Sequence, residues 1–474
     1  MKKAVMLFVA AVAACRVFAA WEKVAEIQIA DKGALTQAAM KLGELTGNQM
    51  IGSMLAANIP DAPHSDIMGA MRVDSQYLAA IYLETDMLSA AKLDDAGEGA
   101  LLYPATVGKD GFLAANPAYS EKDGVCTDGE QFVAFSGDGK WAGIAKNAEL
   151  AKKALGEIPA ASAPMKGSLV RVAVPRRGIE ALRVVVDEAL KTADATNRNA
   201  IASAKVLLDS INGLKASFTL GDKGADVAFV LKIADENLFA GVEKGAIASP
   251  LAFADKSAFY AGEHAADVGC WRIAEAYAAA EDVLRKHEIE LSQFIACGGD
   301  ANDFSLTIDI PAMAAACMSA AQNPAFDNFD PEAFKNEYDA AVAEISGFEW
   351  KGPAQRFAYR LKDREFVAAP GERFAATLPD VKDRQVLSAG FISVYGLLRA
   401  AIDQLLPMAP QEAFGQIKLL VAQLPVEPVA GSASAGWRDG DKIKGVFRIS
   451  TDEIKGIASI VNAAMGAMMA AGMQ

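Results

Sequence analysis

Histidine and cysteine side chains that could together hold a zinc ion occur in one stretch of the second half of the chain: His264, Cys270, His287 and Cys297. Structural zinc sites take their ligands from closely spaced pairs such as C-x2-C or H-x3-H, because such pairs favour a tetrahedral arrangement. Here the four residues are separated by five, sixteen and nine others. We therefore assign no metal ligand and interpret these residues as surface histidines and structural cysteines.

Nucleophilic catalysis has no matching pattern either. A Ser-His-Asp or Cys-His arrangement has to use one of three histidines, of which the third is His64. None of them lies in a recognisable nucleophile context, and the sequence contains no G-x-S-x-G, no phosphate-binding loop and no dinucleotide fingerprint. We assign no catalytic or cofactor-binding residue, and we expect no cofactor.

Acidic residues offer weaker alternatives. The stretches 123–130, 300–303 and 327–330 contain possible calcium ligands, but they lack the spacing, glycine and final glutamate of a calcium loop, so we interpret them as solvated turns. Two carboxylates could also hydrolyse a glycosidic bond, but 60 acidic residues make any choice from sequence arbitrary. Trp141 and Trp437 could stack on sugars, although aromatic residues in strands are more often core or cross-strand partners.

The N-terminus is typical of a secretion signal. Lys2 and Lys3 precede an apolar run, residues 4–14, which is too short to span a bilayer as a stable helix. Val17-Phe18-Ala19 fits the small-x-small pattern recognised by signal peptidases, so we predict that residues 1–20 are removed by cleavage near Ala19 or Ala20. The protein is therefore predicted to be periplasmic or extracellular.

A lipid anchor is the alternative. Val12-Ala13-Ala14-Cys15 resembles the lipobox of bacterial lipoproteins, a family in which the cysteine becomes the acylated first residue. That resemblance implies a diacylated Cys15 holding the protein on a membrane. Arg16 follows directly and an ordinary cleavage site lies close by, so we favour cleavage over lipidation.

Four cysteines remain after cleavage, and they allow three disulfide pairings in an oxidising compartment: Cys126, Cys270, Cys297 and Cys317. Their spacing is wide and irregular, unlike that of a disulfide-dense scaffold. Cys317 lies in an apolar, alanine-rich run and is expected to be buried in a helix. Cys270 with Cys297 is the pair that we expect if any forms.

Composition indicates a globular protein of more than one domain, with 52% hydrophobic and 22% charged residues over 474 positions. Cleavage removes three positive charges and moves the formal net charge from -14 to -17. Such an acidic body repels phosphate backbones and anionic lipid surfaces, so nucleic acid is not an expected partner.

An internal repeat is the strongest organisational feature. A hairpin is predicted over 131–145, and its counterpart over 356–369. A strand at 169–174 matches one at 387–393, and helices follow in which 183–190 and 399–406 share the spacing of arginine, aspartate and leucine. The offset is a little over 215 residues.

The parallel continues to the end of each half. A second helix is predicted near 204–208 and near 417–421, followed by hairpins over 215–233 and 431–449. Acidic pairs, Asp235-Glu236 and Asp452-Glu453, then open a helix in each half. Ser450 and Glu453 have capping-box spacing. At the front, 26–29 is matched less clearly with 258–261.

These elements predict an α+β fold of two similar lobes, 21–245 and 246–474, each an antiparallel-rich sheet with helices packed on one face. The absence of strict β-α alternation argues against a doubly wound parallel sheet. The acidic helix within 323–351 is expected on the outside of the second lobe or between the lobes. The apolar segment 457–473 is predicted to be a docked terminal helix rather than a marginal membrane span.

The segment from Phe132 to Leu155, a hairpin followed by a short helix, resembles elements of uncharacterised secreted bacterial proteins that repeat α+β units. That resemblance implies an envelope protein with no assigned activity. We expect a non-enzymatic binding or structural protein whose ligand or partner site lies between the lobes, the partner being an envelope protein, a polymer or a small apolar ligand. The alternatives are an envelope-polymer hydrolase using carboxylates and a lipid carrier with a continuous aliphatic tunnel.

Overall fold

A computed structural model describes residues 21–59, 75–84, 97–193, 198, 201–202, 205, 208–234, 247–265, 273–286, 289–299, 303–320, 330–343, 355–381, 383–408 and 421–472. Several predicted features lie outside these residues, among them the signal peptide, the lipobox, His64, Cys270, His287 and the acidic pair Asp235-Glu236. Most of both second helices, 204–208 and 417–421, also lies outside them.

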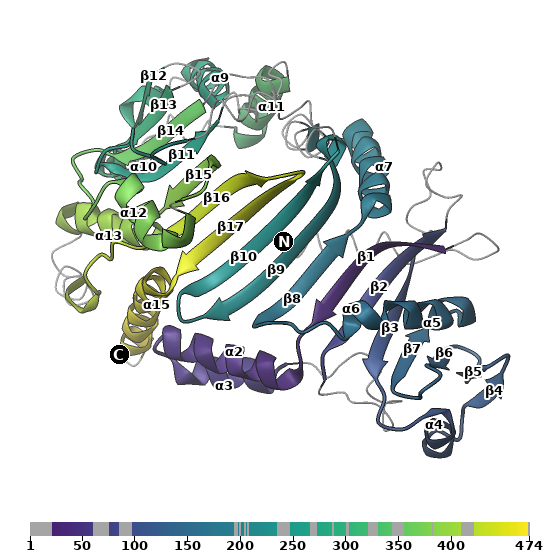
Figure 1. Ribbon diagram of the computed structural model, residues 1–474. Helices are drawn as coiled ribbons and strands as arrows, with labels where there is room; N and C mark the ends of the chain where they lie inside the picture. Colours follow the sequence, from purple (N-terminus) through teal and green to yellow (C-terminus); the bar gives the residue numbers. More distant parts are fainter. Residues whose placement is uncertain are drawn as a thin grey trace.

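The described residues form one sheet of seventeen strands (Figure 1). Hydrogen-bonded neighbours give the order β4-β5-β6-β7-β3-β2-β1-β8-β9-β10-β17-β16-β15-β11-β14-β13-β12. Among the described pairings, β13 with β14 is parallel and the others are antiparallel. The predicted α+β class is thereby confirmed.

The strands are β1 (Trp21–Ile29), β2 (Tyr77–Glu84), β3 (Gly97–Pro104), β4 (Ser120–Lys122), β5 (Val125–Thr127), β6 (Phe132–Phe135), β7 (Trp141–Ala145), β8 (Ser168–Val174), β9 (Ile211–Gly221), β10 (Gly224–Ile233), β11 (Ala258–His264), β12 (Ile295–Gly299), β13 (Asp303–Ile308), β14 (Gln355–Leu361), β15 (Val386–Ile392), β16 (Ser432–Asp439) and β17 (Lys442–Ser450).

The helices connect and cover these strands. They are α2 (Lys32–Leu45), α3 (Gln49–Ala57), α4 (Lys109–Ala115), α5 (Ala148–Ala154), η4 (Leu155–Glu157), α6 (Ile158–Ala161), α7 (Arg176–Thr192), α9 (Ile273–Lys286), η7 (Leu291–Gln293), α10 (Ile310–Ala320), α11 (Pro331–Ala343), α12 (Pro370–Thr377), η9 (Pro379–Val381), α13 (Val394–Leu405), η10 (Leu406–Met408) and α15 (Thr451–Gly472).

Both faces of the sheet bear helices, whereas the sequence predicted helices on one face. On what we call the front face, α5 and α6 cover a core around Tyr82 and Leu102, and α12 covers a core around Phe391 (Figure 1). On the back face, α7 packs beside Ile81 and α13 beside Phe259. The reason is that strands such as β2 carry apolar side chains on both sides, so each face has to be removed from water.

The middle of the front face has no covering helix among the described elements. In Figure 1 the strands β8, β9, β10 and β17 lie open between α6 and α12. Pairing of β10 with β17 carries the sheet unbroken from the first half of the chain into the second. The two halves are therefore joined edge to edge rather than stacked face to face.

One predicted hairpin is wrong. In the first half β6 and β7 form the predicted pair over 131–145, but in the second half only β14 forms, because the chain beyond it is not a strand. The Phe366 N–H donates to the Lys256 carbonyl at 2.8 Å, and Pro370 then begins α12. The predicted strands and hairpins at 169–174, 387–393, 215–233 and 431–449 are confirmed.

The predicted terminal helix is confirmed as α15, which packs against α13, β10 and β17. Among the described residues, no helix is long and apolar enough to cross a bilayer. Ser450 caps α15 as expected, since its hydroxyl accepts from the Glu453 N–H at 3.1 Å. The Glu453 side chain does not complete a capping box; its carboxylate accepts from the backbone N–H of Val394 and Tyr395 at the start of α13. The acidic α11 lies on α9, on the outside of the second half (Figure 1).

Candidate functional site

A single row of paired residues crosses the front face of the sheet. In the registered pairs, Val386 of β15 lies opposite Trp437 of β16, and Trp437 lies opposite Lys444 of β17. Lys444 lies opposite Val230 of β10, and Val230 lies opposite Lys215 of β9. Directly opposed residues in antiparallel strands project from the same face. The row therefore connects side chains from both halves of the chain on one surface.

Four lysines of this surface surround a hollow of about 720 Å³, which we call the lysine cleft. Lys215 and Lys444 belong to the row itself. Lys232 and Lys442 lie directly opposite each other, two residues further along β10 and β17. Lys23, Glu26 and Arg176 also line the hollow. The cleft thus lies where the two halves of the chain meet.

Most of the cations at the edges of the cleft have acidic partners. Lys23 contacts Glu26 at 2.7 Å and Glu157 at 2.5 Å; burial acts to lower its pKa, but these hydrogen bonds outweigh burial and raise it. Arg176 pairs with Glu180 at 3.0 Å. Lys444 forms an ion pair with Asp439, and the hydrogen bond from Lys444 lowers the Asp439 pKa.

The central lysines differ. Lys215, Lys232 and Lys442 are exposed, and none of the three forms a close ion pair within the described part of the chain. Asp439 of β16 lies opposite Lys442, but its carboxylate pairs with Lys444. Like charges directly opposite each other in neighbouring strands destabilise a sheet. Lys232 and Lys442 therefore repel each other from fixed positions in two paired strands. An anion bound between them would relieve that repulsion.

The other end of the same strand pair has the opposite arrangement. Asp226 of β10 lies opposite Arg448 of β17, and the guanidinium donates two hydrogen bonds to the carboxylate, at 2.7 and 2.6 Å. Arg448 also donates to the Thr377 carbonyl of α12 at 3.2 Å. One end of the junction thus pairs an acid with a base, while the other places two lysines opposite each other.

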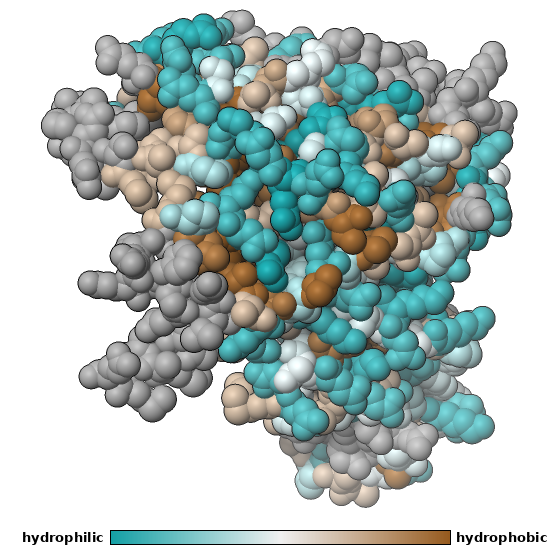
Figure 2. Space-filling model, turned by 90° about the vertical axis from the view of Figure 1, so that its left-hand side faces the viewer, coloured by the Kyte–Doolittle hydropathy of each residue, from teal (hydrophilic) through white to brown (hydrophobic). Residues whose placement is uncertain are grey.

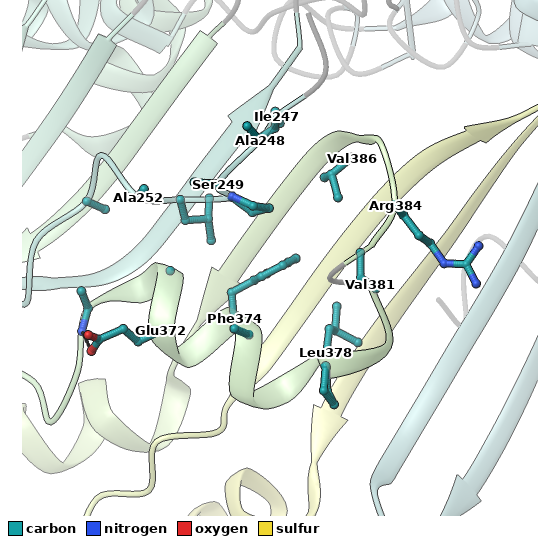
Figure 3. A pocket seen from close by; sticks show the side chains of 17 residues that line it. Ile247, Ala248, Ser249, Ala252, Glu372, Phe374, Leu378, Val381, Arg384 and Val386 are labelled. Atoms are coloured by element: carbon teal, nitrogen blue, oxygen red, sulfur yellow. Dashed lines mark hydrogen bonds between the residues drawn. The ribbon is translucent and has the colours of Figure 1, made fainter.

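A second hollow, of about 600 Å³, lies between α12 and the segment 247–254; we call it the α12 cavity (Figure 3). Phe374, Leu378 and Val386 contribute apolar walls, and their side chains are at most 4% exposed. Figure 3 shows the Phe374 ring in the middle of the view, while the charged ends of Glu372 and Arg384 point outwards at opposite sides. The interior of the cavity is therefore apolar, and its charged groups lie at the rim.

Arg384 belongs to the α12 cavity and contacts Trp437 of the row. It lines the α12 cavity, and its guanidinium lies over the Trp437 ring at 4.6 Å from the ring centre. Its positive charge also helps to lower the Asp439 pKa, after the larger effects of Lys444 and Lys442. The Trp437 Nε1 is buried and has no hydrogen-bond acceptor among the described residues. Trp437 itself lies in the row between Val386 and Lys444.

A buried ionic cluster joins α12, α13 and α15. The Arg373 side chain is fully buried, its Nη2 lies 3.0 Å from Glu427 Oε1, and its guanidinium lies over the Phe391 ring at 4.9 Å. Burial lowers the Arg373 pKa and raises those of Glu427 and Glu453. Each carboxylate is engaged by Arg373 or by backbone N–H groups, so we assign the cluster a structural role.

The residues considered for zinc do not form a site in the described chain. His264 is half-buried in β11, with its ring 5.8 Å from that of Phe357, and burial lowers its pKa. Cys297 is exposed on β12 and is a free thiol, as is the buried Cys126; Cys270, the partner expected for Cys297 if a disulfide forms, lies outside the described residues. No group of three or more possible metal ligands occurs among the described residues. Cys317 belongs to the expected helix, α10.

The acidic loop that is fully described behaves as a turn. Asp128 accepts from the backbone N–H of Glu130 and Gln131 at 2.9 and 2.8 Å, which is an Asx turn. Of the other two acidic stretches, only the last residues, Asp303 and Asp330, lie within the described chain. Trp141 is a partly buried strand residue packed against the front-face core.

The lysine cleft was not predicted. Lys215, Lys232 and Lys444 were expected in hairpin strands but not on a common surface. The alternation of Lys442 and Lys444 was a signal that both lie on one face of a strand. What brings them to Lys232 is the pairing of β10 with β17, which are separated by more than two hundred residues.

No protein-family model, no curated protein and no solved structure matches this chain.

Proposed function

We propose that this protein is an exported binding protein, without enzymatic activity, that holds an anionic ligand in the lysine cleft. The observation that carries the proposal is the cross-strand pair of Lys232 and Lys442, both exposed. Asp439 lies opposite Lys442 on the other side, but its carboxylate already forms an ion pair with Lys444. The cleft uses strands from both halves, in keeping with a site at the junction of two lobes.

The spacing of the lysines favours a ligand with at least two negative groups. Neighbouring strands lie about 4.8 Å apart, which is the backbone separation at Lys232 and Lys442. Lys215 and Lys444 lie two strands apart, about 10 Å by the same spacing. A molecule with several carboxylate or phosphate oxygens could engage this array at more than one point.

The overall charge of the chain restricts the kind of anion. With a formal net charge of -14, the protein surface repels large polyanions. A small concave region lined by cations can still concentrate a compact anion, because the surrounding low-dielectric walls focus the local field. The proposed ligand is therefore a small multivalent anion rather than a nucleic acid.

We propose further that the chain arose by duplication of a unit represented by 21–245 and 246–474. In support, the strand order outward from the junction is β10-β9-β8-β1-β2 on one side and β17-β16-β15-β11-β14 on the other. The third strand of this order is β8 in the first half and β15 in the second. A front-face helix precedes each of them in the chain, α6 and α12, and a back-face helix follows each, α7 and α13. Under this correspondence, Lys442 on β17 takes the position that Asp226 has on β10, and Lys232 on β10 takes the position that Arg448 has on β17.

The hydrolase alternative receives less support. Glu26 is the acidic residue among those lining the lysine cleft, and Glu372 is the acidic residue lining the α12 cavity. Glycoside hydrolysis uses two convergent carboxyl groups, and each hollow supplies one from the described chain. Export through the predicted signal peptide remains part of the proposal, with a lipid anchor at Cys15 as the alternative.

Isothermal titration calorimetry of the chain beginning at Trp21 tests the anion site, with pyrophosphate and citrate as probes. We expect binding that weakens as salt concentration rises, and at least tenfold weaker binding in the double variant Lys232→Gln/Lys442→Gln. The matched control is Lys122→Gln/Lys146→Gln, which removes the same charge from exposed positions of the first half. Binding that is absent in the wild type, or equal in the two double variants, would refute the proposal.

A further inference from the structure

We propose that the lysine cleft and the α12 cavity are two parts of one site for an anionic amphiphile, a molecule with a single alkyl chain and a phosphate or carboxylate head. The head would lie among the lysines and the chain in the α12 cavity. This inference rests on the proposed anion-binding function and names the class of ligand.

One row of side chains connects the two hollows. Val386 lines the α12 cavity and Lys444 lines the lysine cleft, and Trp437 is registered between them in the same cross-strand row. Two strand spacings separate Val386 from Lys444, about 10 Å. The three side chains share one face of one sheet, so the sheet residues that line the two hollows lie on the same face.

Polar and apolar groups are separated along this row. Toward β10 the surface presents lysines, and toward β15 it presents the walls of the α12 cavity, with Phe374 and Leu378 buried beneath α12. On the flank drawn in Figure 2, apolar residues form separate patches among hydrophilic ones. An ordered change from cations to apolar walls along one row matches the two ends of an amphiphile.

Arg384 and Trp437 lie together where the apolar part of the row meets its cationic part. Arg384 lines the α12 cavity and lies over Trp437, the neighbour of Lys444 in the row. An arginine stacked on an indole keeps its N–H donors directed sideways, where they can bind an acidic head. The unpartnered Trp437 Nε1 lies at the same boundary. The head and the chain of an amphiphile would join here.

The size of the cavity suits one alkyl chain. Its volume of about 600 Å³ falls within the range of small-molecule sites. Each methylene removed from water contributes about 0.8 kcal/mol, which corresponds to roughly fourfold tighter binding. Affinity should therefore rise with chain length until the cavity is filled.

The test compares inorganic phosphate with butyl, hexyl, octyl and decyl phosphate below their micelle concentrations, using calorimetry on the chain beginning at Trp21. We expect affinity to rise about 16-fold with each pair of methylenes, at about fourfold for each one, until the cavity is filled. Decanoate is measured beside decyl phosphate, because the tighter binder of the two shows whether the site prefers a carboxylate or a phosphate head.

A variant that fills the cavity separates this inference from the function on which it rests. Ala375 is exposed and lines the cavity, whereas its neighbour Ala376 is exposed on the same helix and does not line it. We expect Ala375→Trp to abolish the dependence on chain length while phosphate binding is kept, and Ala376→Trp to leave both unchanged.

Two results would overturn the inference while leaving the anion site intact: decyl phosphate binding no more tightly than phosphate, or a chain-length dependence that survives in Ala375→Trp. Failure of every anion to bind would instead overturn the proposed function.

Discussion

The aromatic ring of Phe229 lies against the backbone of Gly445, its registered partner across the junction of β10 and β17. A Cβ atom built on Gly445 would lie 2.1 Å from Cζ of that ring. No side chain fits there while the ring keeps its place. The contact lies at the centre of the strand pair that joins the two halves of the chain, so it is a sensitive point of the fold.

Substitution of Gly445 by alanine should weaken the junction. The added methyl group forces the Phe229 ring or the strand to move, and overpacking of this kind costs about 1–3 kcal/mol. Urea unfolding measures the loss. Gly99→Ala in β3 is the control, because a Cβ there meets no atom within 4 Å. Equal stability of the two variants would show that the Phe229 contact is loose.

Reversal of one charge in the lysine cleft should stabilise the protein while removing its proposed function. In Lys232→Glu a favourable pair with Lys442 replaces the repulsion, while the neighbour on the other strand is Gly213. Cross-strand charge pairs contribute about 0.2–1 kcal/mol. We expect a higher Tm at low ionic strength, a smaller gain in 1 M salt because of screening, and no pyrophosphate binding. Lys122→Glu, at an exposed position of β4, controls for net charge. A variant less stable than the wild type would contradict the proposed repulsion.

Removal of the acid at the other end of the junction should have the opposite effect on stability. Asp226→Ala leaves Arg448, whose side chain is 9% exposed, without its carboxylate partner. An uncompensated buried charge is strongly destabilising, and because Asp226 is itself partly exposed we expect a loss of about 2 kcal/mol. Denaturant unfolding should show at most about 0.5 kcal/mol for Lys223→Gln, whose partner Asp380 is exposed. Similar losses would show that burial of Arg448 does not matter.

The buried carboxyl of Glu453 should affect the pH dependence of stability. Burial raises its pKa in the folded protein above the ordinary 4.5, so the folded state holds this proton more tightly than the unfolded state. The contribution of Glu453 to stability is therefore present below the ordinary value and is lost as pH rises through the raised pKa.

The variant Glu453→Gln stays neutral and retains one acceptor for the α13 N–H groups. Its stability relative to wild type should increase as pH rises from 4 to 8 in a series of urea titrations. Glu130→Gln, at an exposed turn position, serves as the reference. A difference between Glu453→Gln and wild type that is constant over this pH range would rule out burial as the dominant effect.

Local patterns predicted most elements of the two halves. Alternating apolar residues at 215–233 and 431–449 became the hairpins β9–β10 and β16–β17, because strand formation needs only one apolar face and a turn between two such runs. Ser450 with Glu453 located the start of α15 for a similar reason, since a cap acts within one turn. The run at 365–369 failed because Pro370 and the packing of Phe366 lead the chain into α12 instead.

The amino-acid sequence alone thus determined the class of fold, the positions of its main strands and helices and the absence of a recognisable catalytic motif, because these depend on neighbours a few residues apart. Only the tertiary structure decided that the two halves share one sheet, that helices cover both of its faces, and that Lys232 lies opposite Lys442. Register between distant strands depends on the packing of the whole sheet, and no local pattern specifies which of many similar strands will become partners.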